Sequence, residues 1–222
     1  MSRTYEVNLE IAGPVAIWTR GDTGDSPASY PVPTYSAVKG IFESVLFNQV
    51  VEVVPTKAEI CSPLVYYAYH TNYGGPLRKS GVIDGGGSYQ LLATVLMNPC
   101  YRLYATLSPN RYQPEDVSSI TRSWEQRTTN PLHAFQEIFN RRLKRGQCFS
   151  IPFLGWKEFT PDYVGVFREG TCVQNDVNLN IPSMVRQVFP HGLSSDLDYV
   201  YDQDVRIVNG VLVYPERSSS HA

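Results

Sequence analysis

Apolar side chains occupy every second position from Tyr5 to Ile11, with polar residues between them. This period of two is typical of a strand with one buried face, and Gly13-Pro14 ends it. A β-branched run and further alternating stretches occur later in the chain. The predicted strands are residues 5–11, 15–18, 50–54, 100–107 and 147–153, and residues 205–214 are predicted to form a hairpin of two strands.

Residues 29–47 predict a loop followed by an amphipathic helix. Pro33 disfavours helix in the residue before it, and the Thr34 hydroxyl can cap the first turn. Apolar residues then recur at helical spacing, at Val38, Ile41, Val45 and Leu46. Gly40 costs about 1 kcal/mol relative to alanine inside a helix. We therefore expect close packing at Gly40, against a strand of the protein or against a phosphate backbone.

A second helix is predicted to begin at Asn130, a capping residue followed by Pro131 at the first helical position. Its apolar face consists of Leu132, Phe135, Phe139 and Leu143. Gly146 is expected to end it. Residues 109–129, which precede this helix, are polar and predicted to be irregular.

The order of these elements predicts an α+β fold of the ferredoxin-like type, with the split βαβ pattern also found in RNA-recognition modules. Residues 1–153 form this domain, and residues 63–97 are inserted in it. Residues 154–215 are predicted to form a small C-terminal β subdomain that ends in a hairpin turning at Asn209-Gly210. Residues 216–222 are expected to be a disordered tail.

The inserted segment 63–97 is rich in tyrosine and glycine, and we interpret it as a protruding hairpin or loop. Its candidate contact residues for nucleic acid or a neighbouring subunit are Tyr66, Tyr67, Tyr69, His70, Tyr73, Arg78 and Lys79. The alternative is a surface insertion whose tyrosines have no such role.

The composition excludes a protein that binds nucleic acid through a uniformly basic surface. The 222 residues carry a formal net charge of −2, and 18% of them are charged. Any nucleic acid must therefore bind a local patch. The 15 tyrosines and 9 phenylalanines can fill a core, and aromatic side chains also stack on bases.

The four cysteines show no C-x-x-C spacing and have no histidines at ligand spacing, so no metal or other cofactor is predicted. The chain starts without an apolar signal core, and no window approaches 18 apolar residues. These features predict a cytoplasmic protein with reduced thiols.

The strongest candidate for phosphate binding is the basic end of the second helix and the turn after it. This site comprises Arg141, Arg142, Lys144, Arg145, Gly146 and Gln147. Arg20, Lys39 and Gly40 could add to the same surface. The alternative is that the helix-end cations are solvated and compensate the helix dipole.

Three stretches carry a family resemblance, and they span most of the chain. Residues 29–45 read S-Y-x-V-P-T-x-x-A-x-x-G-I-x-E-S-V. Residues 142–159 contain R-x-x-x-G-Q-x-F and then L-G-x-K-E-F, and residues 208–215 read V-N-G-V-L-V-Y-P. In this order the stretches resemble the CRISPR-associated Cas5 family, especially its subtype I-C branch.

The resemblance implies a structural subunit of a type I CRISPR surveillance complex that binds the 5′ handle of the guide RNA. It also implies contacts to the large subunit and the first backbone subunit, with 63–97 as a thumb reaching across the guide–target duplex. Target DNA is then read by base pairing. A ferredoxin-like RNA-binding protein that acts alone is a further alternative.

Some members of the subtype I-C branch resemble metal-independent endoribonucleases that process precursor RNA. Their catalytic tyrosine and lysine correspond to Leu46 and Leu132 here, and only the histidine, His133, matches. Leucine cannot transfer a proton or hold a charge. The resemblance therefore predicts no catalysis, unless Tyr35, Tyr101 or Lys39 substitutes.

Overall fold

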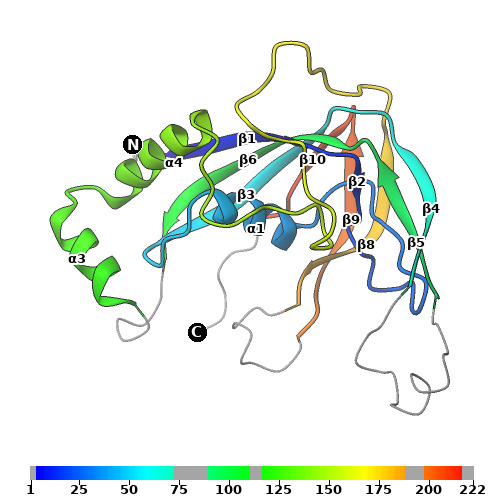
Figure 1. Cartoon of the computed structure of the whole chain (residues 1–222), viewed down its shortest axis with the longest axis horizontal. Coiled ribbons are helices and arrows are strands. Elements are labelled where there is room, and N and C mark those ends of the chain that lie inside the picture. Colours follow the sequence, from blue (N-terminus) through cyan, green and yellow to red (C-terminus); the bar gives the residue numbers. More distant parts are fainter. Residues whose placement is uncertain (1–3, 73–89, 111–116, 189–197, 217–222) are drawn as a thin grey trace.

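The computed structural model describes residues 4–72, 90–110, 117–188 and 198–216 (Figure 1). The helices are α1 (Tyr35–Val45), α3 (Ser119–Arg127) and α4 (Pro131–Lys144). The strands are β1 (Tyr5–Ala12), β2 (Val15–Ala16), β3 (Val51–Ile60), β4 (Val65–Asn72), β5 (Gln90–Met97), β6 (Cys100–Pro109), β7 (Tyr163–Gly165), β8 (Leu179–Gln187), β9 (Val200–Val208) and β10 (Val211–Val213).

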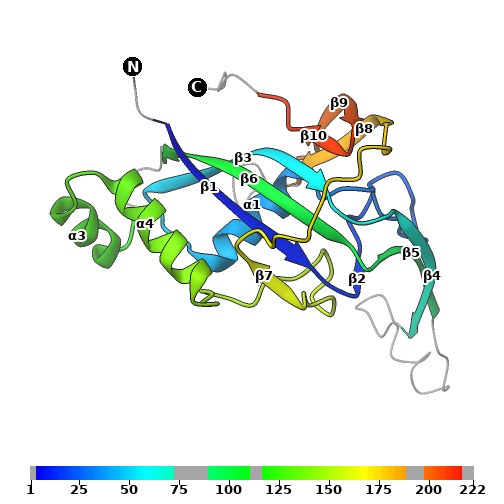
Figure 2. The same ribbon diagram turned by 90° about the horizontal axis from the view of Figure 1, so that it is seen from above.

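The predicted α+β fold is confirmed, and the main sheet has the strand order β7-β1-β6-β3-β10-β9-β8. The first four positions reproduce the split βαβ arrangement, with α1 between β1 and β3 and with α4 between β6 and β7. Figure 2 shows β1, β6 and β3 side by side. Leu103 of β6 lies opposite Leu9 of β1 and Ala58 of β3, which fixes the buried register.

The prediction of a strand at 147–153 is wrong, and β7 occupies the fourth position of the sheet instead. The backbone N–H of Phe149 donates to the carbonyl oxygen of Ser44 at 2.7 Å, and that of Ser150 donates to the same oxygen at 3.0 Å. The last carbonyls of a helix have no partner within the helix. Segment 147–153 supplies N–H groups to the last carbonyl oxygens of α1. It therefore does not pair with the sheet.

The strands of residues 154–215 extend the main sheet at both of its edges. β7 pairs with β1, and β10 pairs with β3 and β9. The predicted turn between β9 and β10 is present, with φ of 51° at Asn209 and 74° at Gly210. A Cβ atom on Gly210 would lie 2.4 Å from the carbonyl oxygen of Gln174, so the turn also requires glycine sterically.

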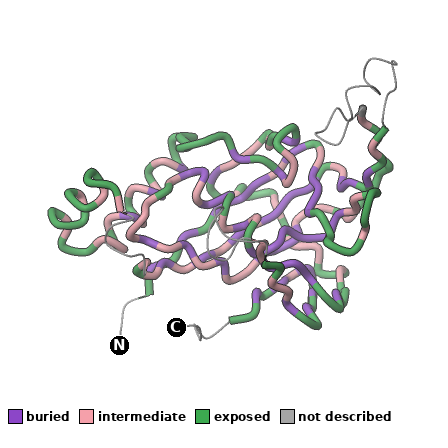
Figure 3. The backbone as a smooth tube through the Cα atoms, turned by 90° about the horizontal axis from the view of Figure 1, so that it is seen from below, coloured by how far each residue is buried: buried purple, intermediate pink, exposed green. Residues whose placement is uncertain are grey.

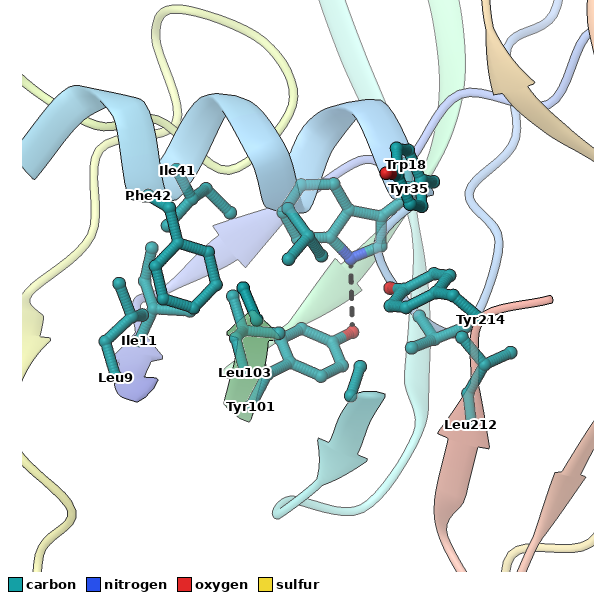
Figure 4. Packing of buried hydrophobic residues seen from close by; sticks show 14 of the residues in the cluster. Leu9, Ile11, Trp18, Tyr35, Ile41, Phe42, Tyr101, Leu103, Leu212 and Tyr214 are labelled. Carbon is teal, nitrogen blue, oxygen red and sulfur yellow. Dashed lines mark hydrogen bonds between the residues drawn. The ribbon is translucent and has the colours of Figure 1, made fainter. Parts of the chain in front are cut away.

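The core lies between the sheet and the two predicted helices, α1 and α4. Thr34 and Asn130 cap them as expected, accepting from the backbone N–H groups of Ala37 and His133. Phe42 of α1 contacts Phe139 of α4, with ring centroids 5.7 Å apart. Figure 4 shows the apolar side of α1 above the buried strand residues.

The region predicted to be irregular contains a helix, α3, within residues 109–129. Its N-cap is Ser118, whose hydroxyl accepts from the Thr121 N–H at 3.2 Å. None of its residues is buried, and Figure 3 shows it exposed at one end of the molecule. Sequence periodicity could not reveal it, because a helix without a buried face has no apolar stripe.

The inserted segment forms a hairpin at its base, with β4 and β5 paired along their length and β2 added beside β5. Tyr69 anchors this hairpin to the body, since its ring lies 5.4 Å from that of Phe159 and 6.4 Å from that of Trp156. Predicted contact residues Tyr73, Arg78 and Lys79 lie outside the described residues, as do 217–222 of the predicted tail.

The segment that follows β7 covers one end of the sheet face opposite α1, around Glu10, Arg102 and Tyr104 (Figure 1). Arg102 of β6 donates to the carbonyl oxygens of Arg168 at 3.0 Å and Thr171 at 2.8 Å. Phe167 lies against Tyr104, with ring centroids 5.3 Å apart. RNA-recognition modules stack bases on this face, so the protein's own chain blocks stacking at the covered end.

A buried carboxylate fixes this covering segment. The side chain of Glu10 is inaccessible to solvent, and it accepts hydrogen bonds from Arg168, Thr171 and Arg102. Burial by itself raises the pKa of Glu10, but these hydrogen bonds outweigh it and hold the pKa below its usual value.

Replacing Glu10 with glutamine should lower the free energy of unfolding at pH 7 by about 3 kcal/mol, because the arginines lose a buried counter-charge. A carboxylate with a depressed pKa stabilises the fold above its unfolded pKa, and this contribution is lost as pH falls through the folded pKa. The difference between wild type and Glu10→Gln should therefore shrink below about pH 4. Urea titrations at several pH values measure it, and a pH-independent difference would contradict the charge argument.

Candidate nucleic-acid interface

The basic end of α4 closes in a Schellman motif. Gly146 has a φ of +63°, as predicted for the residue that ends the helix. Its N–H donates to the Leu143 carbonyl oxygen at 3.2 Å, and the N–H of Gln147 donates to the Arg142 carbonyl oxygen at 2.9 Å. The chain therefore turns sharply away from α4 and continues along the C-terminal end of α1.

We call the cations of this turn the basic cluster; they are Arg141, Arg142, Lys144 and Arg145. Three of them are exposed, and Arg142 is half-buried. Within the described part of the chain, none of these four side chains forms an ion pair. Their charges are therefore available to an anionic ligand, in addition to favouring the helix end.

The other two cations proposed for this surface are already paired. Arg20 donates through two nitrogens to the carboxylate of Asp22, at 3.0 and 2.7 Å. The ammonium of Lys39 lies 3.0 Å from a carboxylate oxygen of Glu52. Burial lowers the pKa of Lys39, but the charge of Glu52 outweighs it and raises the pKa above its usual value. Neither cation is a free ligand for phosphate.

A groove of about 270 Å³ runs beside α1. One wall is the helix face formed by Ser36, Ala37, Gly40 and Ser44, and the other is the segment 150–155. A Cβ atom on Gly40 would have no atom within 4 Å. The expectation that a strand of the protein packs against Gly40 is therefore wrong, and the glycine opens onto the groove instead.

The second wall of the groove is held rigidly by Gly155. This glycine has a φ of +96°, and a Cβ atom there would lie 1.7 Å from the Ile17 carbonyl oxygen. The Ile17 N–H donates to the Leu154 carbonyl oxygen at 2.9 Å. The close approach permits only glycine, which gives a structural reason for the L-G-x-K-E-F stretch.

The base of the thumb hairpin presents two exposed tyrosines, Tyr66 at 46% and Tyr67 at 61% exposure. His70 is also exposed, whereas Tyr69 is half-buried against the body. The predicted contact residues of the thumb therefore divide into exposed side chains that can contact a ligand and one that anchors the hairpin.

Two of the three positions that the sequence resemblance matched to catalytic residues are apolar packing positions. Leu46 and Leu132 both pack against the core. His133 is exposed on the first turn of α4, and its ring meets that of Tyr5 edge-on at a centroid distance of 6.1 Å.

The three possible substitutes are engaged elsewhere. The hydroxyl of Tyr101 is buried and accepts from the Trp18 indole N–H (Figure 4). It donates to the Pro31 carbonyl oxygen. Burial raises the pKa of Tyr101 well above its usual value. Tyr35 lies at the opposite end of α1 from Leu46, with the Arg186 guanidinium over its ring, and Lys39 is paired as described.

The aromatic ring beside His133 belongs to Tyr5, which sequence analysis placed at the start of a strand. Its hydroxyl oxygen accepts from the side-chain amide of Asn130 at 2.7 Å. No spacing rule links residues 5 and 133, because the sheet and α4 bring them together. Tyr5 is therefore a candidate for a second proton-transfer group that sequence analysis missed.

The described residues contain no group of three or more His, Cys, Asp and Glu side chains that could hold a metal ion. No helix among them is long and apolar enough to cross a membrane. The four cysteines have free thiols.

Known proteins resemble this chain in sequence and in fold. It is 26% identical over 187 residues to the CRISPR pre-crRNA endoribonuclease Cas5d of Thermus thermophilus, covering 81% of this chain and 71% of that protein. It is 26% identical over 168 residues to the enzyme of the same name from Mannheimia succiniciproducens, covering 69% of each chain. A crystal structure of a CRISPR-associated protein matches with a TM-score of 0.67 at 18% identity, covering 99% of this chain and 96% of that one.

The resemblance noted in the sequence is confirmed by a family match that includes the α1 stretch, the basic cluster and the groove. Residues 7–183 match the family described as CRISPR-associated protein (Cas_Cas5), in its Cas5d form. The match covers more than half of the chain. The chain belongs to the Cas5 family of CRISPR-associated proteins.

Proposed function

We propose that this chain is the subunit of a type I CRISPR surveillance complex that holds the 5′ handle of the guide RNA. The observation that carries the proposal is the basic cluster, whose four cations have no ionic partner among the described residues. Arginine and lysine side chains of this kind bind phosphates. Because the chain belongs to a family of CRISPR-associated proteins, we take RNA to be the polyanion that binds there.

The geometry supports a path for RNA beside the sheet and not across it. The segment after β7 covers one end of the face used by RNA-recognition modules, around Arg102. The basic cluster leads directly into segment 147–155, which lines the groove beside α1. Exposed tyrosines on the thumb hairpin provide a further surface on which RNA bases can stack.

The partners follow from the family assignment. We infer that the chain assembles in the cytoplasm with the large subunit and the first backbone subunit, and meets target DNA only through the guide. The thumb hairpin projects from one end of the molecule (Figure 1), where it can reach a neighbouring subunit or the guide–target duplex. Specificity for the target then comes from base pairing.

A second candidate function is processing of the precursor RNA, since both sequence relatives are named pre-crRNA endoribonucleases. Cleavage of this kind needs a base for the 2′-hydroxyl, an acid for the leaving oxygen and a cation for the phosphate. Leu46 and Leu132 supply none of these, and His133 with Tyr5 is the remaining pair. We therefore favour binding over cleavage.

Replacing Arg141 and Arg145 together with alanine should weaken binding of a repeat RNA and reduce its salt dependence. The slope of log K against log salt should fall by about 1.4, at about 0.7 per phosphate contact on single strands. Fluorescence anisotropy at several salt concentrations measures it. The control replaces exposed Arg127 and Arg206, which changes the net charge equally; an equal effect there would remove the cluster from the site.

Substitutions at Gly40 separate its cost to the helix from its role in the groove. Gly40→Ala should raise the free energy of unfolding by about 1 kcal/mol, because alanine favours helix and meets open space. Gly40→Gln should also stabilise the helix, but its longer side chain fills the groove and should weaken RNA binding. If Gly40→Gln binds RNA as tightly as Gly40→Ala, RNA does not pass through the groove.

The purified protein should not cleave a repeat RNA in the absence of metal. Losing one positioned acid or base costs about 10²–10⁴ in rate, so the Leu46 position alone makes processing slow. The assay compares repeat RNA with the same RNA carrying a 2′-deoxy nucleotide at the cut site. Cleavage that disappears with the 2′-deoxy substitution, and also with His133→Ala or Tyr5→Phe, would establish the second candidate function.

A further inference from the structure

Two phenylalanine rings lie exposed where segment 147–153 crosses the end of α1. Phe149 is 65% exposed and Phe47 is 46% exposed. Their ring centroids are 6.2 Å apart, with the ring planes inclined by 32°. We call this pair the aromatic shelf. Packing within the described fold leaves much of both rings in contact with water, so the shelf offers an apolar surface to a ligand.

The aromatic shelf is held in place by backbone hydrogen bonds. The N–H of Phe149 donates to the carbonyl oxygens of Ser44 and Val45, at 2.7 and 3.2 Å. Phe47 follows Leu46, the C-cap of α1, whose N–H donates to the Phe42 carbonyl oxygen. Both rings therefore project from backbone tied to the end of one helix. A ligand that contacts the shelf meets a preorganised surface.

The shelf lies between the basic cluster and the groove. Cys148 alone separates Phe149 from Gln147, whose N–H is bonded to the carbonyl oxygen of Arg142. Burial raises the pKa of the Cys148 thiol, and the charge of nearby Arg142 opposes this effect without reversing it. On the other side, Ile151 is 77% exposed and lines the groove.

The side chains around the aromatic shelf indicate which class of ligand can bind there. Unpaired cations next to exposed aromatic faces form the combination that binds single-stranded nucleic acid, because phosphates meet the charges and bases stack on the rings. A duplex keeps its bases paired and stacked within the helix, and an acidic peptide would use the cations but leave the rings uncovered. The chemistry therefore favours an unpaired strand of RNA.

We propose that the aromatic shelf stacks a base of single-stranded RNA whose neighbouring phosphates contact the basic cluster. This inference rests on the proposed function and assigns it a base-contacting residue, Phe149. The shelf adds affinity that depends on the base and not on the charge. Its contribution should therefore leave the salt dependence of binding unchanged, in contrast to that of the arginines.

The test measures binding of the full chain to two probes, a 12-nucleotide oligoadenylate and the same ribose-phosphate backbone without bases. Wild type should bind the oligoadenylate more tightly. Phe149→Ala should weaken that binding by about tenfold, as expected for loss of one stacked base, and should leave binding to the abasic probe unchanged. Phe149→Leu should behave like Phe149→Ala, and Phe149→Trp should retain the affinity.

The matched control is Val213→Ala, which truncates an apolar side chain on β10. Val213 is 66% exposed, similar to Phe149. It should bind both probes like wild type. If Phe149→Ala matches this control while the basic-cluster variants lose affinity, the shelf assignment is wrong and the proposed function stands. If wild type binds neither probe nor a repeat RNA, both are wrong. Circular dichroism melting verifies that the variants fold, as expected for an exposed side chain.

Discussion

The buried carboxylate of Glu10 holds a covering segment over one end of the sheet face opposite α1. Its hydrogen bonds to Arg102, Arg168 and Thr171 connect the central strands to the segment that follows β7. A buried charge is tolerated only when it is paired and hydrogen-bonded, so the carboxylate and its covering segment depend on each other. As a result, the chain itself covers the end of this face around Glu10 and Arg102, whereas Glu6 and Asn8 on the same face remain exposed.

The groove and the aromatic shelf lie on the other side of the sheet, around α1. There the backbone of residues 147–155 has no strand partner, and its N–H groups satisfy the end of the helix instead. The same segment connects the basic cluster, the aromatic shelf and the groove wall in a single stretch of chain. Gly146 and Gly155 make this path possible, since both adopt a positive φ.

The resulting surface combines charge, aromatic rings and a groove. Leu46 and Leu132, which the sequence resemblance matched to reactive positions, pack against the core, and Tyr101 is buried and bonded to Trp18 and Pro31. Binding therefore accounts for more of the observed surface than catalysis does.

The sequence by itself determined both helices of the core, their caps, the β9–β10 turn and the basic cluster, because these depend on local spacing and on residues within one turn. It also carried the motifs of the Cas5 family. Only the tertiary structure decided that 147–153 is not a strand, that Lys39 pairs with Glu52, and that Tyr5 meets His133. Those outcomes depend on partners distant in sequence. The hydrogen bonds and charges of an extended segment can be satisfied by several such partners, and packing selects among them.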